Sequence, residues 1–201
     1  METGNIIAVY NKNKQVALQE FDSLMHKTSA YMNETARNTS HYVGCDSKLL
    51  EKETVIAMKE QCKYTLFKPD DIQLISGQRF PDIVAANHFG VEVKSTKENK
   101  WVSTGSSIVE STRVENVNHI YMLFGKLGGN PVEFKCKPYQ NCLYDIAVTH
   151  SPRYLIDMEI SQDKTIFSKM GIEYDKFRLS ENPINTCLLY TSPSPRDRSV
   201  S

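Results

Sequence analysis

The sequence predicts a mixed α+β (α/β) fold in which helices flank a central mixed β-sheet. Three observations support it: two segments of helical periodicity open the chain, short β-rich runs separated by turns follow, and an almost wholly apolar run lies beyond them. This order is typical of a sheet covered by helices. With 201 residues, 40% of them hydrophobic and 24% charged, the chain has a globular composition and can bury a sizeable core. We expect one domain over residues 1–187.

Two helices are predicted in the first half. Across Lys14–Asn33, apolar residues recur at spacings of three and four, without Gly or Pro. The second helix covers Ser47–Cys62, where Asp46 or Ser47 can cap the first turn and Leu50 begins the apolar side.

A β-hairpin is predicted next. The alternating run Asp71–Ile75 is a first strand, and Pro81–Ala86 and Gly90–Ser95 are two more, joined through Asn87-His88-Phe89. With that three-residue loop, Ala86 lies opposite Gly90 and Asp82 lies opposite Lys94.

The elements that follow alternate between polar and apolar segments. A polar loop is expected from Thr96 to Ser106 and a helix over Ser107–Val117. His119–Gly125 is apolar on both sides, as in a buried central strand. The alternating Val132–Cys136 is expected as an outer strand, and Leu143–Val148 as a further strand.

The hairpin carries the candidate chemistry. Alternate side chains of a strand share a face, so Glu92 and Lys94 point together, and the returning strand brings Asp82 beside them. A shift of one residue would break the cluster, so the hypothesis requires an odd loop or a bulge near Asp82. Two neighbouring carboxylates repel unless a cation lies between them, and hard oxygen ligands suit Mg²⁺. Lys94 would orient a water or stabilise charge building on a phosphate.

The Glu-x-Lys pattern alone is not specific, because the chain contains it three times. Glu98-Asn-Lys100 lies in a polar loop, and Glu133-Phe-Lys135 fits the solvated face of an outer strand. Only Glu92-Val93-Lys94 combines a buried-looking strand with a Pro-Asp partner at hairpin distance.

From Pro81-Asp82 and Glu92-Val93-Lys94, in this order and spacing, the chain resembles the PD-(D/E)xK nuclease superfamily, and more narrowly a type II restriction endonuclease. The resemblance covers about Ser47 to Asp157. It implies a core of a helix, a three-stranded meander carrying the acids and lysine, a helix and a further strand. It also implies Mg²⁺ held by Asp82, Glu92 and Val93, and cleavage of double-stranded DNA by a homodimer.

The family usually places one more acid on the first core helix. Glu51 and Glu53 both offer themselves here, and Glu51 is favoured narrowly because it shares a face with Val55 and Met58. Either can also be ordinary surface charge in a first helical turn, where acids suit the helix dipole.

DNA contacts are expected after the active strand, where cationic side chains reach phosphates and polar ones reach base edges. Arg113 is the leading base contact, because a guanidinium can pair bidentately with guanine, and the loop over residues 150–154 is a second candidate. A solvated loop or a structural ion pair fits each of them at least as well. Trp101 is expected as a packing anchor and His88 as a turn residue. The full set of expected DNA-binding residues is Lys97, Lys100, Ser103, Thr104, Ser106, Ser107, Arg113, His150 and Arg153.

Two alternatives stay open. The chain can be another nuclease of the same superfamily, acting in DNA repair or junction resolution, or a non-catalytic DNA-binding domain of the same fold. The intact Asp82, Glu92 and Lys94 set argues against the second.

The overall charge balance neither requires nor excludes DNA. There are 24 Lys and Arg against 24 Asp and Glu, yet residues 92–137 carry 7 basic and 5 acidic residues. This modest basic centre predicts weak non-specific binding, with specificity left to metal and base contacts.

The cysteines and the termini bear on the compartment. Five cysteines without a Cys-x-x-Cys pair suit free thiols better than disulfides or a zinc site. No signal peptide or apolar stretch of membrane-spanning length is seen, so a cytoplasmic location is expected. Residues 188–201 form a Ser/Pro/Arg-rich tail that resembles translated cloning sequence and is expected to be disordered. The natural protein is therefore expected to continue past about Cys187.

Overall fold

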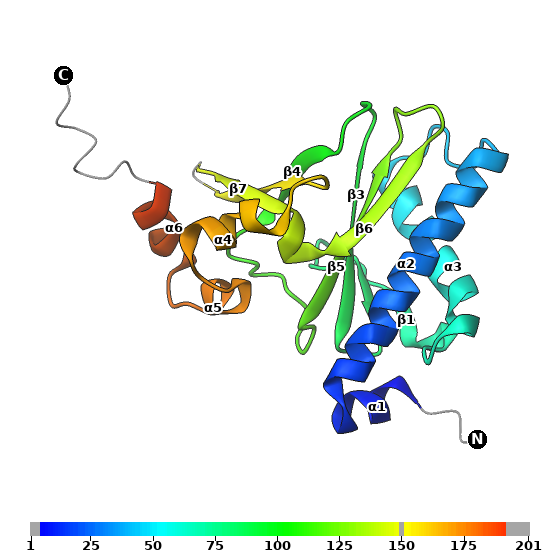
Figure 1. Cartoon of the computed structure of the whole chain (residues 1–201), viewed down its shortest axis with the longest axis horizontal. Helices are drawn as coiled ribbons and strands as arrows, with labels where there is room; N and C mark the ends of the chain where they lie inside the picture. The colour runs from blue at the N-terminus through cyan, green and yellow to red at the C-terminus, as the bar shows by residue number, and fades with distance from the viewer. Residues whose placement is uncertain (1–4, 149–150, 192–201) are drawn as a thin grey trace.

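A five-stranded mixed sheet lies at the centre of the fold, with strand order β1-β2-β3-β5-β6 (Figure 1). The computed structural model describes residues 5–148 and 151–191, without the side chains of residues 189–191. A second, three-stranded sheet has the order β4-β8-β7. The expectation of a mixed α+β fold with a central mixed sheet flanked by helices is confirmed. The strands are β1 (Ile72–Leu74), β2 (Ile83–Ala85), β3 (Phe89–Thr96), β4 (Val102–Ser107), β5 (His119–Lys126), β6 (Glu133–Pro138), β7 (Leu143–Ala147) and β8 (Arg153–Asp157).

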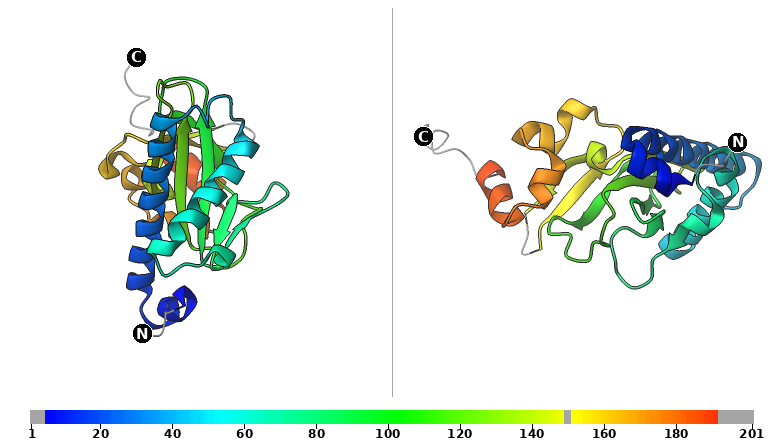
Figure 2. Two further views of the ribbon diagram at one scale, coloured as in Figure 1. Left: turned by 90° about the vertical axis from the view of Figure 1, so that its right-hand side faces the viewer. Right: turned by 90° about the horizontal axis from the view of Figure 1, so that it is seen from below.

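Helices α1 (Ile6–Lys12), α2 (Lys14–Asn38) and α3 (Ser47–Gln61) precede the sheet, and α2 and α3 cover one of its faces (Figure 2, left). Side-chain caps account for where α2 and α3 begin. The Asn13 side chain accepts the Val16 amide at 3.3 Å, and that of Asp46 accepts the Leu49 amide at 2.8 Å. Both predicted helices are confirmed, with α2 extending beyond the expected end.

The other face of the sheet packs against the three-stranded sheet and the C-terminal helices (Figure 1). Two hydrophobic cores result, one on each side of the central sheet. α6 continues to Thr191, so Leu188 to Thr191 are helical and the expectation that the tail begins as a disordered segment at 188 is wrong there. Residues 192–201 lie outside the described ranges. The remaining helices are α4 (Ile166–Met170), α5 (Tyr174–Arg178) and α6 (Pro183–Thr191), with 3₁₀ turns η1 (Cys62–Tyr64), η2 (Pro69–Asp71), η3 (Tyr139–Cys142) and η4 (Gln162–Lys164).

The hairpin between β2 and β3 has an odd loop, as expected, but begins one residue earlier. Ala85 pairs with Phe89 and Val84 with Gly90, so the loop is Ala86–His88. Phe89 joins the strand because its ring is fully buried, whereas Ala86 and Asn87 adopt left-handed φ values of 48° and 62°. The expected pairings of Ala86 with Gly90 and of Asp82 with Lys94 are therefore wrong.

The corrected register preserves the cluster. Continuing the ladder past Ile83↔Val91 brings Asp82 level with Glu92, two residues from the expected partner and on the same face. Whether Asp82 shares a face with Glu92 depends only on whether the loop has an odd or an even number of residues, and the number is odd, as expected.

The segment between β3 and β5 differs most from expectation. Residues 96–106 were expected as a loop but contain β4, and the helix expected over Ser107–Val117 does not form. Residues 108–118 are turns and bends, with positive φ at Glu110 (47°) and Asn116 (65°) that an α-helix does not allow. Four apolar residues at mixed spacing gave a helical pattern, but tertiary contacts hold the segment in another conformation.

The strands β5, β6 and β7 agree with expectation, whereas β8 was not predicted and contains Arg153 and Tyr154, which were expected in a loop. β5 is buried along most of its length between β3 and β6, and β6 is the outer strand of the central sheet. Trp101 is buried against Phe124, which confirms it as a packing anchor. His88 lies in the hairpin loop and stacks on Tyr10 with ring centroids 4.2 Å apart.

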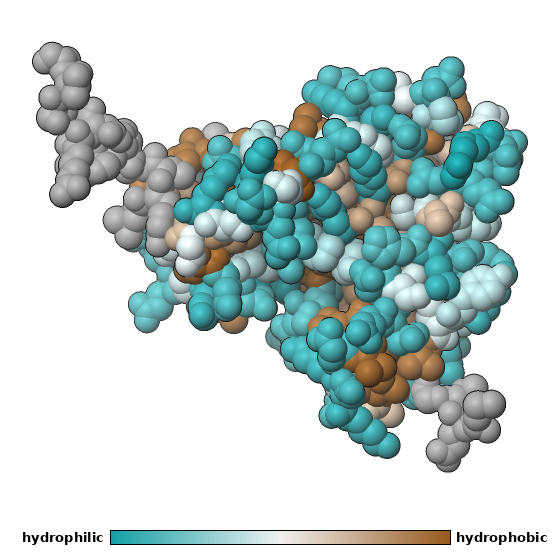
Figure 3. Space-filling view, viewed as in Figure 1, coloured by the Kyte–Doolittle hydropathy of each residue, from teal (hydrophilic) through white to brown (hydrophobic). Residues whose placement is uncertain are grey.

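The surface seen in Figure 3 is mostly hydrophilic, with apolar side chains gathered over α1. No helix among the described residues is long and apolar enough to cross a membrane. Cys45, Cys62, Cys136 and Cys142 form no disulfide, as expected.

Candidate active site

An open stretch of strand edge defines the site. β2 pairs with β3 only as far as Val91, so the following part of β3 has no β2 partner. At this point the Asp82 carboxylate accepts the Val93 amide through Oδ2 at 2.8 Å. The N–H and C=O of one residue point to the same side of a strand, so the Val93 carbonyl also faces the open edge.

Glu92 and Lys94 lie on one face of β3, as the alternation of the strand requires. Lys94 Nζ is 2.7 Å from Glu92 Oε1, and the two side chains are 29% and 5% exposed. Asp82 lies level with Glu92 when the ladder is continued, and its charge raises the pKa of Glu92. The structure therefore brings Asp82, Glu92 and Lys94 together.

The structure also distinguishes the two acids of α3. The charge of Asp82 raises the pKa of Glu51 and the charge of Lys94 lowers it, so Glu51 lies near the cluster. Glu53 instead contacts His41, with its Oε2 2.6 Å from the imidazole Nε2. Of the two acids, Glu51 is the one that interacts with the charges of the cluster, and its role as the helix acid stays a prediction.

The acids of the cluster are poorly compensated. Burial and the Asp82 charge raise the pKa of Glu92, and Lys94 opposes them. The net result is a pKa of about 7. Burial also raises the pKa of Asp82, against the Val93 amide and Lys94. For Glu51, burial and the Asp82 charge both raise the pKa. Three carboxyl groups thus share one cation, and both desolvation and mutual repulsion disfavour their ionised forms.

Lys94 keeps its proton. Burial by itself would lower the pKa of the ammonium, but Glu92, Asp82 and Glu51 raise it above the ordinary value. At neutral pH, Lys94 is therefore a positive charge and hydrogen-bond donor.

This donor set fits a magnesium ion. Three acids and one lysine leave an uncompensated negative charge, and carboxylate and carbonyl oxygens are the ligands that Mg²⁺ prefers. Asp82, Glu92 and the Val93 carbonyl supply them. Within residues 5–148 and 151–191, no His, Cys, Asp or Glu side chains form a ready-made group of three or more that would hold a metal. A centre here would use few protein ligands, consistent with the waters that Mg²⁺ commonly retains.

A residue of the second sheet reaches Glu92, and a tyrosine of η3 holds that residue in turn. Ser106 in β4 donates its hydroxyl to Glu92 Oε1 at 3.3 Å, and Tyr139 in η3 donates its own to Ser106 Oγ at 3.3 Å. Ser106 was expected to contact DNA, and Tyr139 was not identified. No local pattern marks them, because the contact depends on how the two sheets pack.

The three Glu-x-Lys repeats differ in environment. Glu98 and Lys100 pair with each other at 2.7 Å but are 69% and 46% exposed. Glu133 pairs with Lys126, and Lys135 with Glu159. Only the repeat at Glu92 is buried beside a second acid.

Arg113 does not serve as a base contact. Its side chain is 11% exposed and paired with Glu110. It also donates to the Val117 carbonyl from Nε at 3.0 Å and Nη2 at 2.9 Å, and to the Tyr174 hydroxyl at 3.0 Å. The structure shows the alternative, a structural ion pair, because the segment predicted as a helix folds into turns around this guanidinium.

The other expected DNA-binding residues differ in exposure, and Ser107 of β4 lies opposite Arg153 of β8. Lys97, Lys100, Thr104 and Arg153 are exposed, and Ser103 is half-buried. Ser107 accepts the Val109 amide at 3.3 Å. His150 lies outside the described residues.

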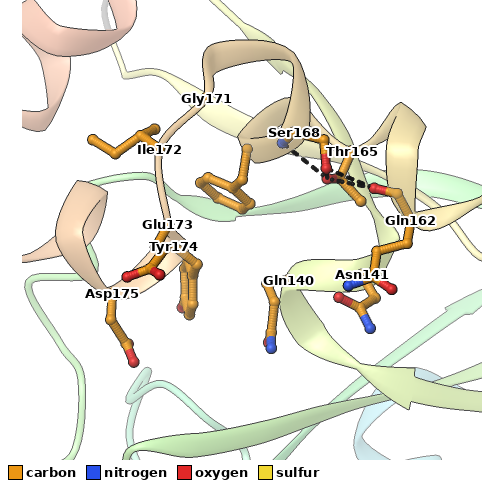
Figure 4. Close-up of a pocket in the computed structure, with 11 residues that line it drawn as sticks. Gln140, Asn141, Gln162, Thr165, Ser168, Gly171, Ile172, Glu173, Tyr174 and Asp175 are labelled. Carbon is orange, nitrogen blue, oxygen red and sulfur yellow. Dashed lines mark hydrogen bonds between the residues drawn. The ribbon is translucent and has the colours of Figure 1, made fainter.

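A pocket of about 490 Å³ lies apart from this cluster (Figure 4). Gln140 and Asn141 of η3 face Tyr174 and Asp175 of α5 across it, and Thr165, Ser168 and Gln162 are hydrogen-bonded on one side. It contains none of the predicted site residues.

Models of known protein families give no match to this chain, and a comparison with curated proteins finds no relative.

Proposed function

We propose that the chain is a Mg²⁺-dependent nuclease that hydrolyses phosphodiester bonds of double-stranded DNA, at specific sequences as type II restriction enzymes do. The observation that carries the proposal is the convergence of Asp82, Glu92, Lys94 and Glu51 at the open edge of β3.

The topology around the site supports a core like that of the PD-(D/E)xK superfamily. α3 precedes the antiparallel meander β1-β2-β3, and β5 then pairs with β3 in parallel. The chain departs from that pattern between β3 and β5, where β4 and turns stand in place of a helix. The departure lies outside the segments that carry the acids and the lysine, because Asp82, Glu92 and Lys94 belong to the meander and Glu51 to the preceding α3.

The chemistry follows from the charges. Mg²⁺ held by Asp82, Glu92 and the Val93 carbonyl would polarise the phosphoryl oxygen and acidify a bound water. Lys94, protonated and fixed by Glu92, is a donor for the negative charge that develops on the phosphate. Glu51 lies on the helix side of the cluster and helps to keep Lys94 protonated.

DNA would approach the exposed residues near the end of β3. Lys97 and Lys100 follow the strand directly and are exposed, so they are suited to phosphates. Thr104 and Arg153 are the remaining exposed candidates. Cleavage of both strands at a palindromic site would suit a homodimer, because two copies match its two-fold symmetry.

The test is cleavage of plasmid DNA by the full chain with 10 mM Mg²⁺ (on the order of that needed to saturate a weak site) or with EDTA. Asp82→Asn and Lys94→Ala should abolish cutting while melting cooperatively. Glu133→Gln and Lys135→Ala change the Glu-x-Lys repeat of β6, whose side chains pair with Lys126 and Glu159, and are the matched controls that should retain cutting.

The products separate the alternatives. Discrete bands support a restriction enzyme, whereas a smear or structure-dependent cutting supports a repair or junction-resolving nuclease. DNA binding without Mg²⁺-dependent cleavage overturns the catalytic proposal in favour of a binding domain.

A further inference from the structure

Glu92 is held by two groups that come from different parts of the fold. Lys94 Nζ lies 2.7 Å from Oε1, and Ser106 Oγ donates to the same oxygen at 3.3 Å. Lys94 belongs to the same strand as Glu92, but Ser106 belongs to the second sheet.

Tyr139 anchors Ser106. Its hydroxyl donates to Ser106 Oγ at 3.3 Å, and its side chain is fully buried. Phe80, Tyr154 and Tyr174 contact the ring, with centroids 5.2, 6.1 and 5.9 Å away. A ring packed on several sides has little rotational freedom, so the core between the two sheets determines where this hydroxyl lies.

The backbone of β4 is also irregular at this point. The register of its pairing with β8 shifts between Thr104 and Ser107, and Ser106 lies within this interval. Irregularities of this kind re-aim side chains, and they are frequent beside active sites. Gly105 allows β4 to lie close to β8, because a Cβ there would lie 3.2 Å from the Tyr154 carbonyl oxygen.

We propose that Ser106 and Tyr139 are positioning residues that hold Oε1 of Glu92 through a Tyr139–Ser106–Glu92 hydrogen-bond chain, which would leave Oε2 available to bind Mg²⁺. This role rests on the proposed function. It goes beyond the acids and lysine, because it makes the second sheet part of the metal site.

Partners that orient a metal-ligating carboxylate affect metal affinity strongly, and their loss typically costs 10- to 100-fold. Ser106→Ala should therefore weaken Mg²⁺ binding about tenfold. Tyr139→Phe should weaken it less, because Ser106 would remain in place. Both should raise the Mg²⁺ concentration needed for half-maximal cleavage while leaving kcat at saturating Mg²⁺ near the wild-type value.

The direct measurement is titration calorimetry with MgCl₂ on the full chain, paired with thermal melts. Ser107→Ala is the matched control, because this neighbouring hydroxyl accepts the Val109 amide instead of contacting Glu92. Ser106→Thr keeps a hydroxyl and should restore affinity, which general loosening of β4 would not explain.

If the wild type binds Mg²⁺ and both Ser106→Ala and Tyr139→Phe bind it with the same affinity, the positioning role alone is overturned. Equal weakening by Ser106→Ala, Ser106→Thr and Ser107→Ala would also overturn it, in favour of a structural effect. Wild type that binds no Mg²⁺ and cuts no DNA would overturn the proposed nuclease and the positioning role with it.

Discussion

Replacing Glu92 by Gln should make the metal-free protein more stable at neutral and alkaline pH. In the folded chain, burial raises the pKa of Glu92 to about 7 from an ordinary value of 4.5. Gln has nearly the same shape as the protonated acid, but it never pays the cost of carrying a buried charge.

The sign follows from where each state releases its proton. The unfolded chain loses the Glu92 proton near pH 4.5, whereas the folded chain holds it until about pH 7. Wild type therefore loses stability as the pH rises through this window, and Glu92→Gln does not. At about 1.4 kcal/mol for each tenfold change in proton affinity, the stability difference between variant and wild type should grow by about 3 kcal/mol from pH 4.5 to pH 8.

The assay is urea unfolding at several pH values in EDTA, with wild type and variant measured side by side. The change in their difference is informative, because pH-independent effects of the substitution cancel. Glu159→Gln is the matched control, because the hydrogen bond from Lys135 lowers the pKa of this exposed acid. Its stability difference from wild type should move in the opposite direction.

A Glu92→Gln difference that stays constant between pH 4.5 and 8 would refute the reasoning, because it would mean that the carboxylate is well compensated. Mg²⁺ added at pH 8 should stabilise wild type by about 2.7 kcal/mol at 100 times its dissociation constant. Glu92→Gln, which lacks a ligand, should respond far less.

Three further predictions concern other parts of the fold. Arg113→Met should lower the free energy of unfolding by about 3–5 kcal/mol in urea titrations, since it leaves Glu110 buried without its cation; a loss below 1 kcal/mol would contradict the buried pair. Gly128→Ala should lower it by about 1–3 kcal/mol, because a Cβ there would lie 2.1 Å from the Lys97 carbonyl oxygen; unchanged stability would show that this turn yields freely. Burial lowers the pKa of His119 to about 4, so wild type should lose stability as the pH falls from 6.5 to 4. His119→Gln should lose less over that window in thermal melts, and identical pH profiles would contradict the burial of this imidazole.

Sequence analysis was most successful where a local rule is sufficient. α2 follows from apolar periodicity, α3 follows from periodicity and the cap Asp46, and β5 follows from an apolar run. The grouping of Asp82 with Glu92 followed from alternation along strands and from the parity of one loop. That parity was enough even though the loop itself was displaced by one residue.

Contacts between distant segments were not predictable in the same way. Arg113 reaches Tyr174, which lies 61 positions later, and this contact helps to hold residues 108–118 in turns. Tyr139 reaches Ser106 across 33 positions. Neither pairing leaves a periodic or spacing signal, because each depends on how two sheets and the C-terminal helices pack.

The sequence by itself determined the mixed α+β class, the principal helices and strands and the set of acids and lysine on one hairpin, because periodicity and alternation are properties of the local chain. Only the tertiary structure decided that Glu51 rather than Glu53 interacts with the charges of this set, that Arg113 is buried in an ion pair, and that Ser106 contacts Glu92 and is itself held by Tyr139. The physical reason is that burial and charge compensation depend on everything packed around a group, and most of those neighbours are far away in the sequence.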